Sequence, residues 1–196
     1  TAFVRDGVFV HVPKGCALDR PIHCVFVAVA NGEPAASHPR SLIIAEQSSQ
    51  ATVIESHVGL GEGLCFSNAV TEVVAGENAL VDHYKLSLAG PSFFQVATQH
   101  LHCGRDSNVS SHAITLGGKL VRNEANALLA GEGCEATING FYMLDGEQHV
   151  DNHTLIEHAE PNCSSHELYK GILDGDSRGV FRGKIYVHQK AQKTDA

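Results

Sequence analysis

A weak internal repeat constrains this chain more than any other feature of its sequence. Each unit has an acidic, Gly or Asn corner, then a small residue, and then a run with the alternation of a β-strand. Taking Ala51, Ala79, Asn108, Cys134 and Cys163 as equivalent positions gives steps of 28, 29, 26 and 29 residues. Periods of about 20–50 residues are typical of solenoids, in which each turn buries its apolar face on the next.

Strands rather than helices fill these repeats, so the predicted solenoid is a β-helix. Residues 180–188 alternate with a period of two, and residues 120–130, whose Ala and Leu would also suit a helix, alternate as well. The hexapeptide signature of left-handed β-helices is absent, and irregular unit lengths favour a right-handed helix. We predict an all-β, single-domain, right-handed parallel β-helix. An antiparallel sandwich stays open, because short strands with frequent turns also fit it.

The charge balance limits the class of partner. The 196 residues carry 14 Lys and Arg against 22 Asp and Glu, a formal net charge of −8. Duplex DNA and anionic membranes both need a basic stripe, so we expect neither as a partner. The longest apolar run, residues 24–30, is far shorter than the ~20 residues of a membrane-spanning helix. No signal-peptide pattern opens the sequence.

Six cysteines are spread thinly and none forms a Cys-x-x-Cys pair, which removes the main support for a zinc finger or a thioredoxin motif. A single domain of this size has enough core to do without disulfides. We therefore expect free, mostly buried thiols in a reducing compartment. The six are Cys16, Cys24, Cys65, Cys103, Cys134 and Cys163.

Thirteen histidines suggest metal binding. His149, Asp151 and His153 are spaced i, i+2 and i+4, which places all three on one face of a strand. Imidazole with carboxylate suits zinc or iron(II), so these three are the candidate metal ligands. The alternative is that such histidines are solvated or hydrogen-bonded to neighbouring turns. Two further groups combine His with Cys: His100, His102 and Cys103, and His158, Cys163 and His166.

No catalytic motif is present. The sequence lacks G-x-S-x-G, H-E-x-x-H and the phosphate-loop pattern. Gly59, Gly61 and Gly63 are predicted to form a solenoid corner rather than a phosphate loop. Carboxylates are scattered and Trp is absent. We therefore assign no catalytic or cofactor-binding residues and do not expect an enzyme.

The C-terminal quarter carries a specific family resemblance. Residues 149–196 contain HAEPNCSSHELYKG and then DGDSRGVFRGKIYVHQKAQKT, and DGVFVHVPKG opens the chain at residues 6–15. These segments resemble the SufB/SufD family of the SUF iron–sulfur cluster assembly machinery, and its SufD members more than its SufB members.

The resemblance implies a right-handed parallel β-helix, in agreement with the repeat. It also implies a cytoplasmic, non-catalytic scaffold that pairs with SufB, docks the SufC ATPase and is implicated in iron supply. No cofactor is expected to be firmly bound, and iron or a transient iron–sulfur cluster would be present only in the full complex.

The resemblance also limits what is carried over. The family's N-terminal helical domain, its Cys-Ser-His-Gly segment and its C-terminal SufC-docking segment have no counterpart here, so residues 1–196 are expected to be the β-helix core domain. No active-site residue of the family maps onto this chain. The metal hypothesis for His149, Asp151 and His153 is therefore independent of the family.

Two other functions stay open. A β-helix polysaccharide lyase or hydrolase would need a carboxylate or Ca²⁺ cluster in an exposed groove. A His-based metal-binding module would need one of the histidine groups above. A homodimer of this region is a further expectation, because unpaired strand edges at the ends of a solenoid tend to associate.

Overall fold

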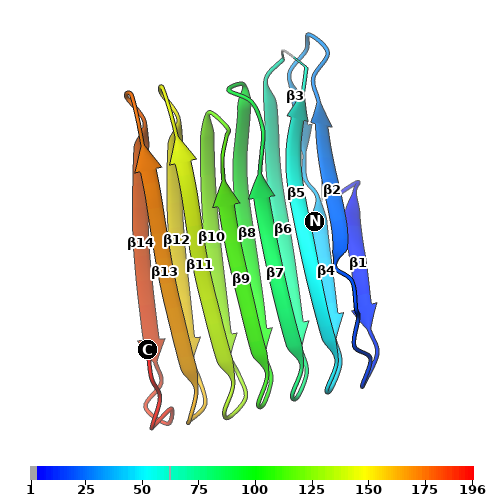
Figure 1. Ribbon diagram of the computed structural model, residues 1–196, viewed down its shortest axis with the longest axis vertical. Helices are drawn as coiled ribbons and strands as arrows, with labels where there is room; N and C mark the ends of the chain where they lie inside the picture. The colour runs from blue at the N-terminus through cyan, green and yellow to red at the C-terminus, as the bar shows by residue number, and fades with distance from the viewer. Residues whose placement is uncertain (1–3, 62) are drawn as a thin grey trace.

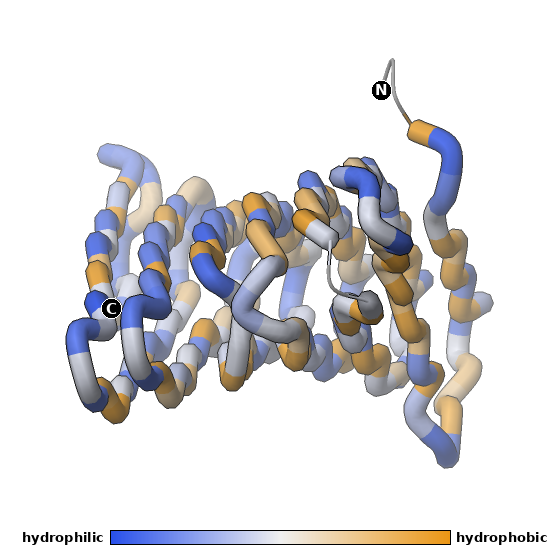
Figure 2. The backbone as a smooth tube through the Cα atoms, turned by 90° about the horizontal axis from the view of Figure 1, so that it is seen from above, coloured by the Kyte–Doolittle hydropathy of each residue, from blue (hydrophilic) through white to orange (hydrophobic). Residues whose placement is uncertain are grey.

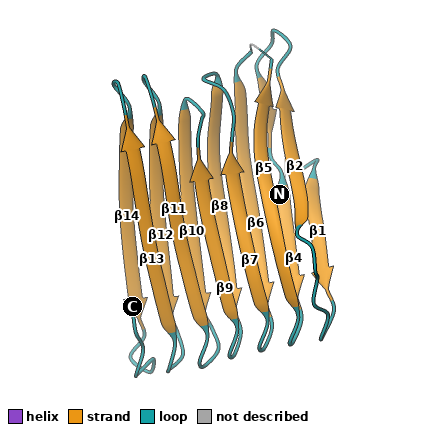
Figure 3. Ribbon diagram, in the orientation of Figure 1, coloured by secondary structure: helices purple, strands orange, loops and turns teal. Residues whose placement is uncertain are grey.

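The computed structural model describes residues 4–61 and 63–196, and every regular element within them is a β-strand (Figures 1 and 3). The strands form two sheets, which appear as two layers when viewed along the strands (Figure 2). Sheet A consists of β1 (Gly7–Val12), β3 (Ala35–Ser37), β4 (Arg40–Ala45), β6 (Cys65–Ala75), β8 (Phe93–Cys103), β10 (Leu120–Leu129), β12 (His149–His158) and β14 (Arg178–Val187). Sheet B consists of β2 (Ile22–Val29), β5 (Gln50–Leu60), β7 (Leu80–Ser87), β9 (Asn108–Thr115), β11 (Glu135–Leu144) and β13 (Ser164–Leu173). No helix that could cross a bilayer occurs in these described ranges.

Consecutive strands alternate between the two sheets from β4 onward, so strands two apart in the sequence pair with each other (Figure 1). All the pairings between the named strands are parallel. Parallel strands cannot be joined by tight hairpins, and the path returns to each sheet through the opposite one. The predicted single-domain parallel β-helix is therefore confirmed, and the antiparallel sandwich is excluded. Residues 120–129 form β10, as predicted.

The register of sheet B corrects the predicted repeat. In consecutive turns the residues opposite one another are Gln50, Leu80, Asn108, Glu135 and Ser164. The buried corner positions just before them are Ser49, Ala79, Ser107, Cys134 and Cys163. The predicted equivalence is correct at three of these five corners. It is wrong at the other two, because Ala51 and Asn108 already lie within strands.

A backbone conformation, rather than composition, marks each of these corners. The residue just before the buried corner position has a positive φ of 53° to 71°. Asn, Asp and Gly tolerate this left-handed conformation best, which explains why they recur between the strands. The five residues are Ser48, Asn78, Asp106, Gly133 and Asn162.

Inward-facing apolar side chains stack from turn to turn in register. One such ladder in sheet A consists of Ile43, Val73, Leu101, Ala127 and Ile156, each at most 2% exposed. Full burial of a Val, Leu or Ile side chain stabilises the fold by roughly 1.5–3 kcal/mol. We call this row of side chains, which lies toward the C-terminal ends of the sheet-A strands, the apolar ladder.

The six cysteines are free, and four of them are buried. This confirms the predicted free, mostly buried thiols. Cys134 and Cys163 stack at corners of adjacent turns with their Sγ atoms 3.6 Å apart. Burial raises the pKa of the Cys103 thiol to about 12, so this side chain is a core residue rather than a reactive thiol.

Two tyrosine rings and two glycines interlock β11 and β13. Gly140 stands opposite Tyr169, and Tyr142 stands opposite Gly171. A Cβ added at Gly140 would lie 2.0 Å from the Tyr169 ring, and one at Gly171 would lie 2.1 Å from the Tyr142 ring. Each ring therefore occupies space that is open only because its neighbour is glycine.

Candidate functional site

The predicted metal ligands lie on the outer face of β12. His149, Asp151 and His153 are each partly buried, while the residues between them point into the interior. His153 Nε2 lies 3.0 Å from Asp151 Oδ1. His149 stands opposite Arg178 of β14. The structure therefore brings two of the three predicted residues into direct contact.

A guanidinium group from the neighbouring turn joins this pair. Arg122 of β10 donates to Asp151 Oδ2 and, at 2.6 Å, to Glu124 Oε1. Its Nη2 also lies 3.3 Å from His153 Nδ1. The hydrogen bond to Glu124, together with the charges of both carboxylates, raises the pKa of Arg122. Both carboxylates are thus already paired with a cation.

Among residues 4–61 and 63–196, no group of three or more His, Cys, Asp and Glu has the geometry to hold a metal ion. The metal hypothesis for the β12 residues stays a prediction. Arg122 precedes its register partner Asp151 by 29 residues, one turn of the repeat. Repeat arithmetic could therefore have identified this missing member of the cluster.

The second histidine group divides between the two faces of β8. Cys103 points into the interior and is fully buried, whereas His100 and His102 are exposed on the outer face. The two histidines border an open groove of about 400 Å³ on sheet A. The groove is also lined by Leu128, Leu155 and Glu157.

The third group does not come together. His158 points into the interior, where its Nε2 lies 2.9 Å from Ser165 Oγ and its Nδ1 lies 2.6 Å from Thr194 Oγ1. Cys163 is buried in a corner, and His166 faces outward beside Glu135. These three side chains serve separate structural contacts.

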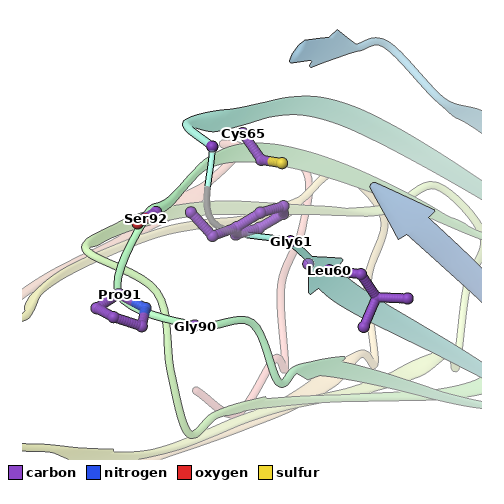
Figure 4. Close-up of a pocket in the computed structure, with 9 residues that line it drawn as sticks. Leu60, Gly61, Cys65, Gly90, Pro91 and Ser92 are labelled. Atoms are coloured by element: carbon purple, nitrogen blue, oxygen red, sulfur yellow. The ribbon is translucent and has the colours of Figure 1, made fainter. Parts of the chain in front are cut away.

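The glycine-rich segment forms a corner at Gly61 and Gly63, as predicted, whereas Gly59 lies within β5 and residue 62 lies outside the described residues. β5 ends at Leu60 and β6 begins at Cys65, and Gly61 in the connection has a φ of 91°. A Cβ there would lie 2.3 Å from the Ala30 carbonyl oxygen. The corner packs beside Gly90 and Pro91 around a pocket of about 50 Å³ (Figure 4). Its backbone conformation and close packing account for the glycines without a phosphate ligand.

A cluster of polar side chains occupies the middle of the solenoid interior, beside the apolar ladder. It was not singled out by the sequence patterns. Some of its members border an internal cavity of about 20 Å³, enough for about one water molecule. We call this cluster the polar interior; it comprises Glu55, His57, Thr71, His83, Lys85, Gln95, Gln99, Ser111 and Asn123.

Glu55 is the anionic centre of the polar interior. Its Oε2 accepts a hydrogen bond from Thr71 at 2.7 Å and lies 3.0 Å from His83 Nε2. Burial alone would raise the pKa of this carboxyl group. The interactions with His83, Ser41 and Thr71 outweigh burial and lower the pKa to about 2. Glu55 is therefore ionised although it is only 1% exposed.

A chain of amide and hydroxyl groups orients the His83 ring. Ser111 donates to Gln99 Oε1 at 2.8 Å, which leaves the Gln99 amide nitrogen to donate to His83 Nδ1 at 2.7 Å. The His83 ring is held between Gln99 at Nδ1 and Glu55 at Nε2. The network thus fixes the orientation of the ring.

Lys85 is the cationic centre of the polar interior. Its Nζ donates to three neutral oxygens, at 2.6 Å to Asn123, 3.0 Å to Gln95 and 3.3 Å to Ser87. Burial lowers the pKa of Lys85 to about 7, and the charge of Glu55 partly offsets this effect. The ammonium group is fully hydrogen-bonded but has no carboxylate in contact.

Two buried atoms of the polar interior, His57 Nε2 and Gln95 Nε2, have no hydrogen-bond partner within the described ranges. Buried polar atoms are normally paired, so such a group of unpaired atoms marks a region that a ligand or solvent can complete.

The polar interior can bind and orient small polar species. The sequence patterns did not reveal the polar interior because its members come from six strands. Each strand contributes only one or two of them, too few to form a recognisable motif. The inward alternation of His83, Lys85 and Ser87 on β7 was the signal that could have found part of it.

Comparisons with known proteins agree with this fold. Residues 26–196 match the family model described as SUF system FeS cluster assembly, SufBD core domain. The chain is 33% identical over 196 residues to the iron–sulfur cluster assembly protein SufD of Escherichia coli, covering 99% of this chain and 46% of that protein. It is 30% identical over 204 residues to an iron–sulfur cluster assembly SufBD family protein of Synechocystis, covering 100% of this chain and 45% of that protein.

A chloroplastic protein of Arabidopsis thaliana, ABCI7, is 27% identical over 198 residues, covering 97% of this chain and 42% of that protein. The chain therefore spans less than half the length of these curated relatives. The family match, by contrast, extends over most of this chain and over strands of both sheets. The chain belongs to the SufBD core family of the SUF iron–sulfur cluster assembly system.

Proposed function

We propose that this chain is the β-helix part of a non-catalytic scaffold subunit in iron–sulfur cluster assembly. In this role it pairs with a SufB-type subunit, contributes to an assembly that docks a SufC-type ATPase, and takes part in iron supply. The observation that carries the proposal is the match of residues 26–196 to the SufBD core domain.

The architecture supports a scaffold role. Parallel strands stacked in register make a body with two broad outer faces, and both expose apolar side chains. Examples are Phe66 and Val74 on sheet A, and Phe141 and Met143 on sheet B. The outer face of sheet A also carries the Arg122 ion-pair network. Family membership also places the chain in cluster assembly rather than among carbohydrate-active β-helix enzymes.

Co-purification tests the proposal. The full-length protein would be co-expressed with the SufB-type and SufC-type proteins of the same organism, with an affinity tag on the SufB-type partner. We expect all three to purify together in fixed proportion, and the full-length protein alone to show no ATP hydrolysis. A SufB–SufC complex that excludes this protein at every concentration would contradict the scaffold role.

A second proposal concerns iron as cargo. We propose that His149, Asp151 and His153 bind iron(II) or zinc after Arg122 moves aside, because a carboxylate and an imidazole already touch there. Anaerobic iron(II) and zinc titrations would compare the wild type with His149→Ala plus His153→Ala and with Arg122→Leu. We expect loss of binding in the double variant and tighter binding in Arg122→Leu. Equal binding by the wild type and the double variant would remove the site.

Location and self-association belong to the same proposal. We place the scaffold in the cytoplasm, where a reducing environment suits its six free thiols. The homodimer through strand edges stays a prediction, and sedimentation of residues 1–196 over a range of concentrations would test it.

A further inference from the structure

Gln95 has a buried amide nitrogen that lacks a hydrogen-bond partner. Its Oε1 accepts from Lys85 Nζ at 3.0 Å and from Ser87 Oγ at 2.8 Å. These two donors fix the orientation of the amide, since a flipped amide would present N–H groups to both. The Nε2 atom therefore offers two N–H donors that no atom of residues 4–61 or 63–196 accepts.

His57 provides a second unpaired nitrogen beside Gln95. The side chain is 3% exposed and its ring stacks on Phe26, with 5.0 Å between ring centroids. Its Nε2 also lacks a partner within the described part of the chain. His57 stands opposite Ser87 in sheet B, and Ser87 donates to Gln95. The two unpaired groups therefore belong to one region of the interior.

A pocket of about 390 Å³ reaches this region from the end of the solenoid at β1 and β2. His57, Ser67, Phe26 and Phe93 line it. Ser67 stands opposite Gln95 in the next turn of sheet A, so the pocket ends against the turn that carries the unpaired amide. The pocket lining offers a small molecule the His57 ring and the Ser67 side chain, and the Gln95 amide lies one turn deeper.

The chemistry of these groups selects an acceptor. The Gln95 amide nitrogen can only donate, so its ligand must be an acceptor, and the protonated form of Lys85 behind it favours an anionic acceptor. We propose that a small monovalent anion binds at the inner end of this pocket, where it accepts hydrogen bonds from Gln95 Nε2 and His57 Nε2. This inference does not depend on the proposed scaffold role.

The surrounding charges imply that a proton accompanies the anion. The titratable or charged groups around His57 are Lys85 and His83 of β7, Glu55 of its own strand and Cys24 of β2, with Asp6 at the rim of the pocket. Burial and the charge of Lys85 lower the pKa of His57 to about 3, so His57 stays neutral in the range tested and donates from Nε2 as one neutral tautomer. The pKa of Lys85 is about 7, so a bound anion favours the protonated form of Lys85, and the accompanying proton is taken up there. Binding is therefore expected to tighten as the pH falls from 8 toward 7, by up to about tenfold per unit, and to level off below pH 7.

Azide is a suitable probe because its infrared stretching band shifts when it leaves water for a hydrogen-bonded site. The full-length protein would be titrated with sodium azide at constant ionic strength and at pH 8, 7 and 6. We expect a saturable, shifted band in the wild type that grows stronger as the pH falls from 8 toward 7 and then levels off. The chain is acidic overall, so saturable anion binding would require a specific site.

Two variants locate the site. Gln95→Glu keeps the shape of the side chain but replaces its N–H donors with a carboxylate oxygen, and the new negative charge pairs with Lys85. Ser67→Leu fills the pocket and leaves the hydrogen bonds of Lys85 in place. We expect each to weaken azide binding at least tenfold. The control Lys119→Met, which removes a cation from an exposed ion pair with Glu147, should bind as the wild type does. Circular dichroism would verify that each variant folds. If Gln95→Glu does not fold, the azide affinity of Ser67→Leu provides the test.

The inference would be overturned by the absence of a saturable band in the wild type, which would leave water as the occupant. Unchanged affinity in a folded Gln95→Glu or Ser67→Leu variant would overturn it as well.

Discussion

The two parts of the solenoid interior are built on the same strands but have opposite chemistry. On β8, Gln95 and Leu101 both point inward and are at most 1% exposed, yet one belongs to the polar interior and the other to the apolar ladder. The apolar ladder needs only shape complementarity between turns. The polar interior needs a hydrogen-bond partner for each polar atom, and two of its atoms, His57 Nε2 and Gln95 Nε2, have none within the described residues.

This difference separates stability from binding along a single strand. The ladder through Leu101 holds adjacent turns together by burial alone. The polar interior keeps an ionised carboxylate, an ammonium group and unpaired N–H donors in a protected space. Stacked parallel strands tolerate this arrangement because the backbone hydrogen bonds between turns do not depend on which side chains point inward.

Removing the anionic centre of the polar interior should have the largest effect. Glu55→Ala leaves His83 and Thr71 without their shared acceptor and Lys85 without its nearest countercharge. We expect a loss of about 3–5 kcal/mol in the free energy of unfolding, measured by urea denaturation. Glu124→Ala on the outer face is the matched control, with an expected loss below about 1 kcal/mol. Equal losses in the free energy of unfolding for Glu55→Ala and Glu124→Ala would show that the buried carboxylate stabilises the fold no more than an exposed one.

Truncating the apolar ladder should cost somewhat less. Leu101→Ala leaves a cavity between Val73 and Ala127, its register partners, and should lower the free energy of unfolding by about 3 kcal/mol. Leu128→Ala, on the outer face of sheet A, should cost less than about 1 kcal/mol. The same urea experiment measures both. A cost for Leu101→Ala as small as that of Leu128→Ala would contradict the structural importance of the ladder.

Lys85 should make stability depend on pH in a predictable direction. Its pKa of about 7 in the folded protein lies below its ordinary value of 10.5, so the unfolded chain binds more protons above pH 7. Stability contributed by this group therefore rises with pH, by about 1.4 kcal/mol per unit at most. We expect the difference in stability between wild type and Lys85→Met to change with this slope between about pH 7 and 8.5. A difference independent of pH would show that the ammonium group is not desolvated in the folded protein.

The Arg122 network should have the smallest effect on stability. The side chain of Arg122 and the carboxylates that it pairs with are partly exposed, so Arg122→Leu should change the free energy of unfolding by less than about 1 kcal/mol. Raising the salt concentration should reduce the difference in stability between the wild type and Arg122→Leu. A loss above about 2 kcal/mol in urea or thermal unfolding would show that these ion pairs stabilise the fold as strongly as the buried network does.

Much of the fold could be predicted from the sequence, because solenoid turns repeat their chemistry. Corner residues with small or left-handed character recur once per turn, and the repeat predicts equivalent corners for Cys134 and Cys163, whose Sγ atoms lie 3.6 Å apart. The same periodicity links Arg122 to Asp151, although the predicted metal ligands do not include Arg122. The sequence could not predict that the corner position of this turn is Ser49 rather than Ala51, since this depends on which residue takes a positive φ at the corner.

The sequence by itself determined the repeating β-strand units, the free thiols and membership of the SufBD core family, whereas the strand pairings of the structure excluded the antiparallel sandwich. Only the tertiary structure decided which polar side chains meet in the interior. Glu55, His83, Gln99 and Ser111 belong to four different strands, and no local pattern records their contacts. Local periodicity sets which face of a strand is buried, whereas the pairing of buried polar atoms depends on how two sheets face each other across the interior.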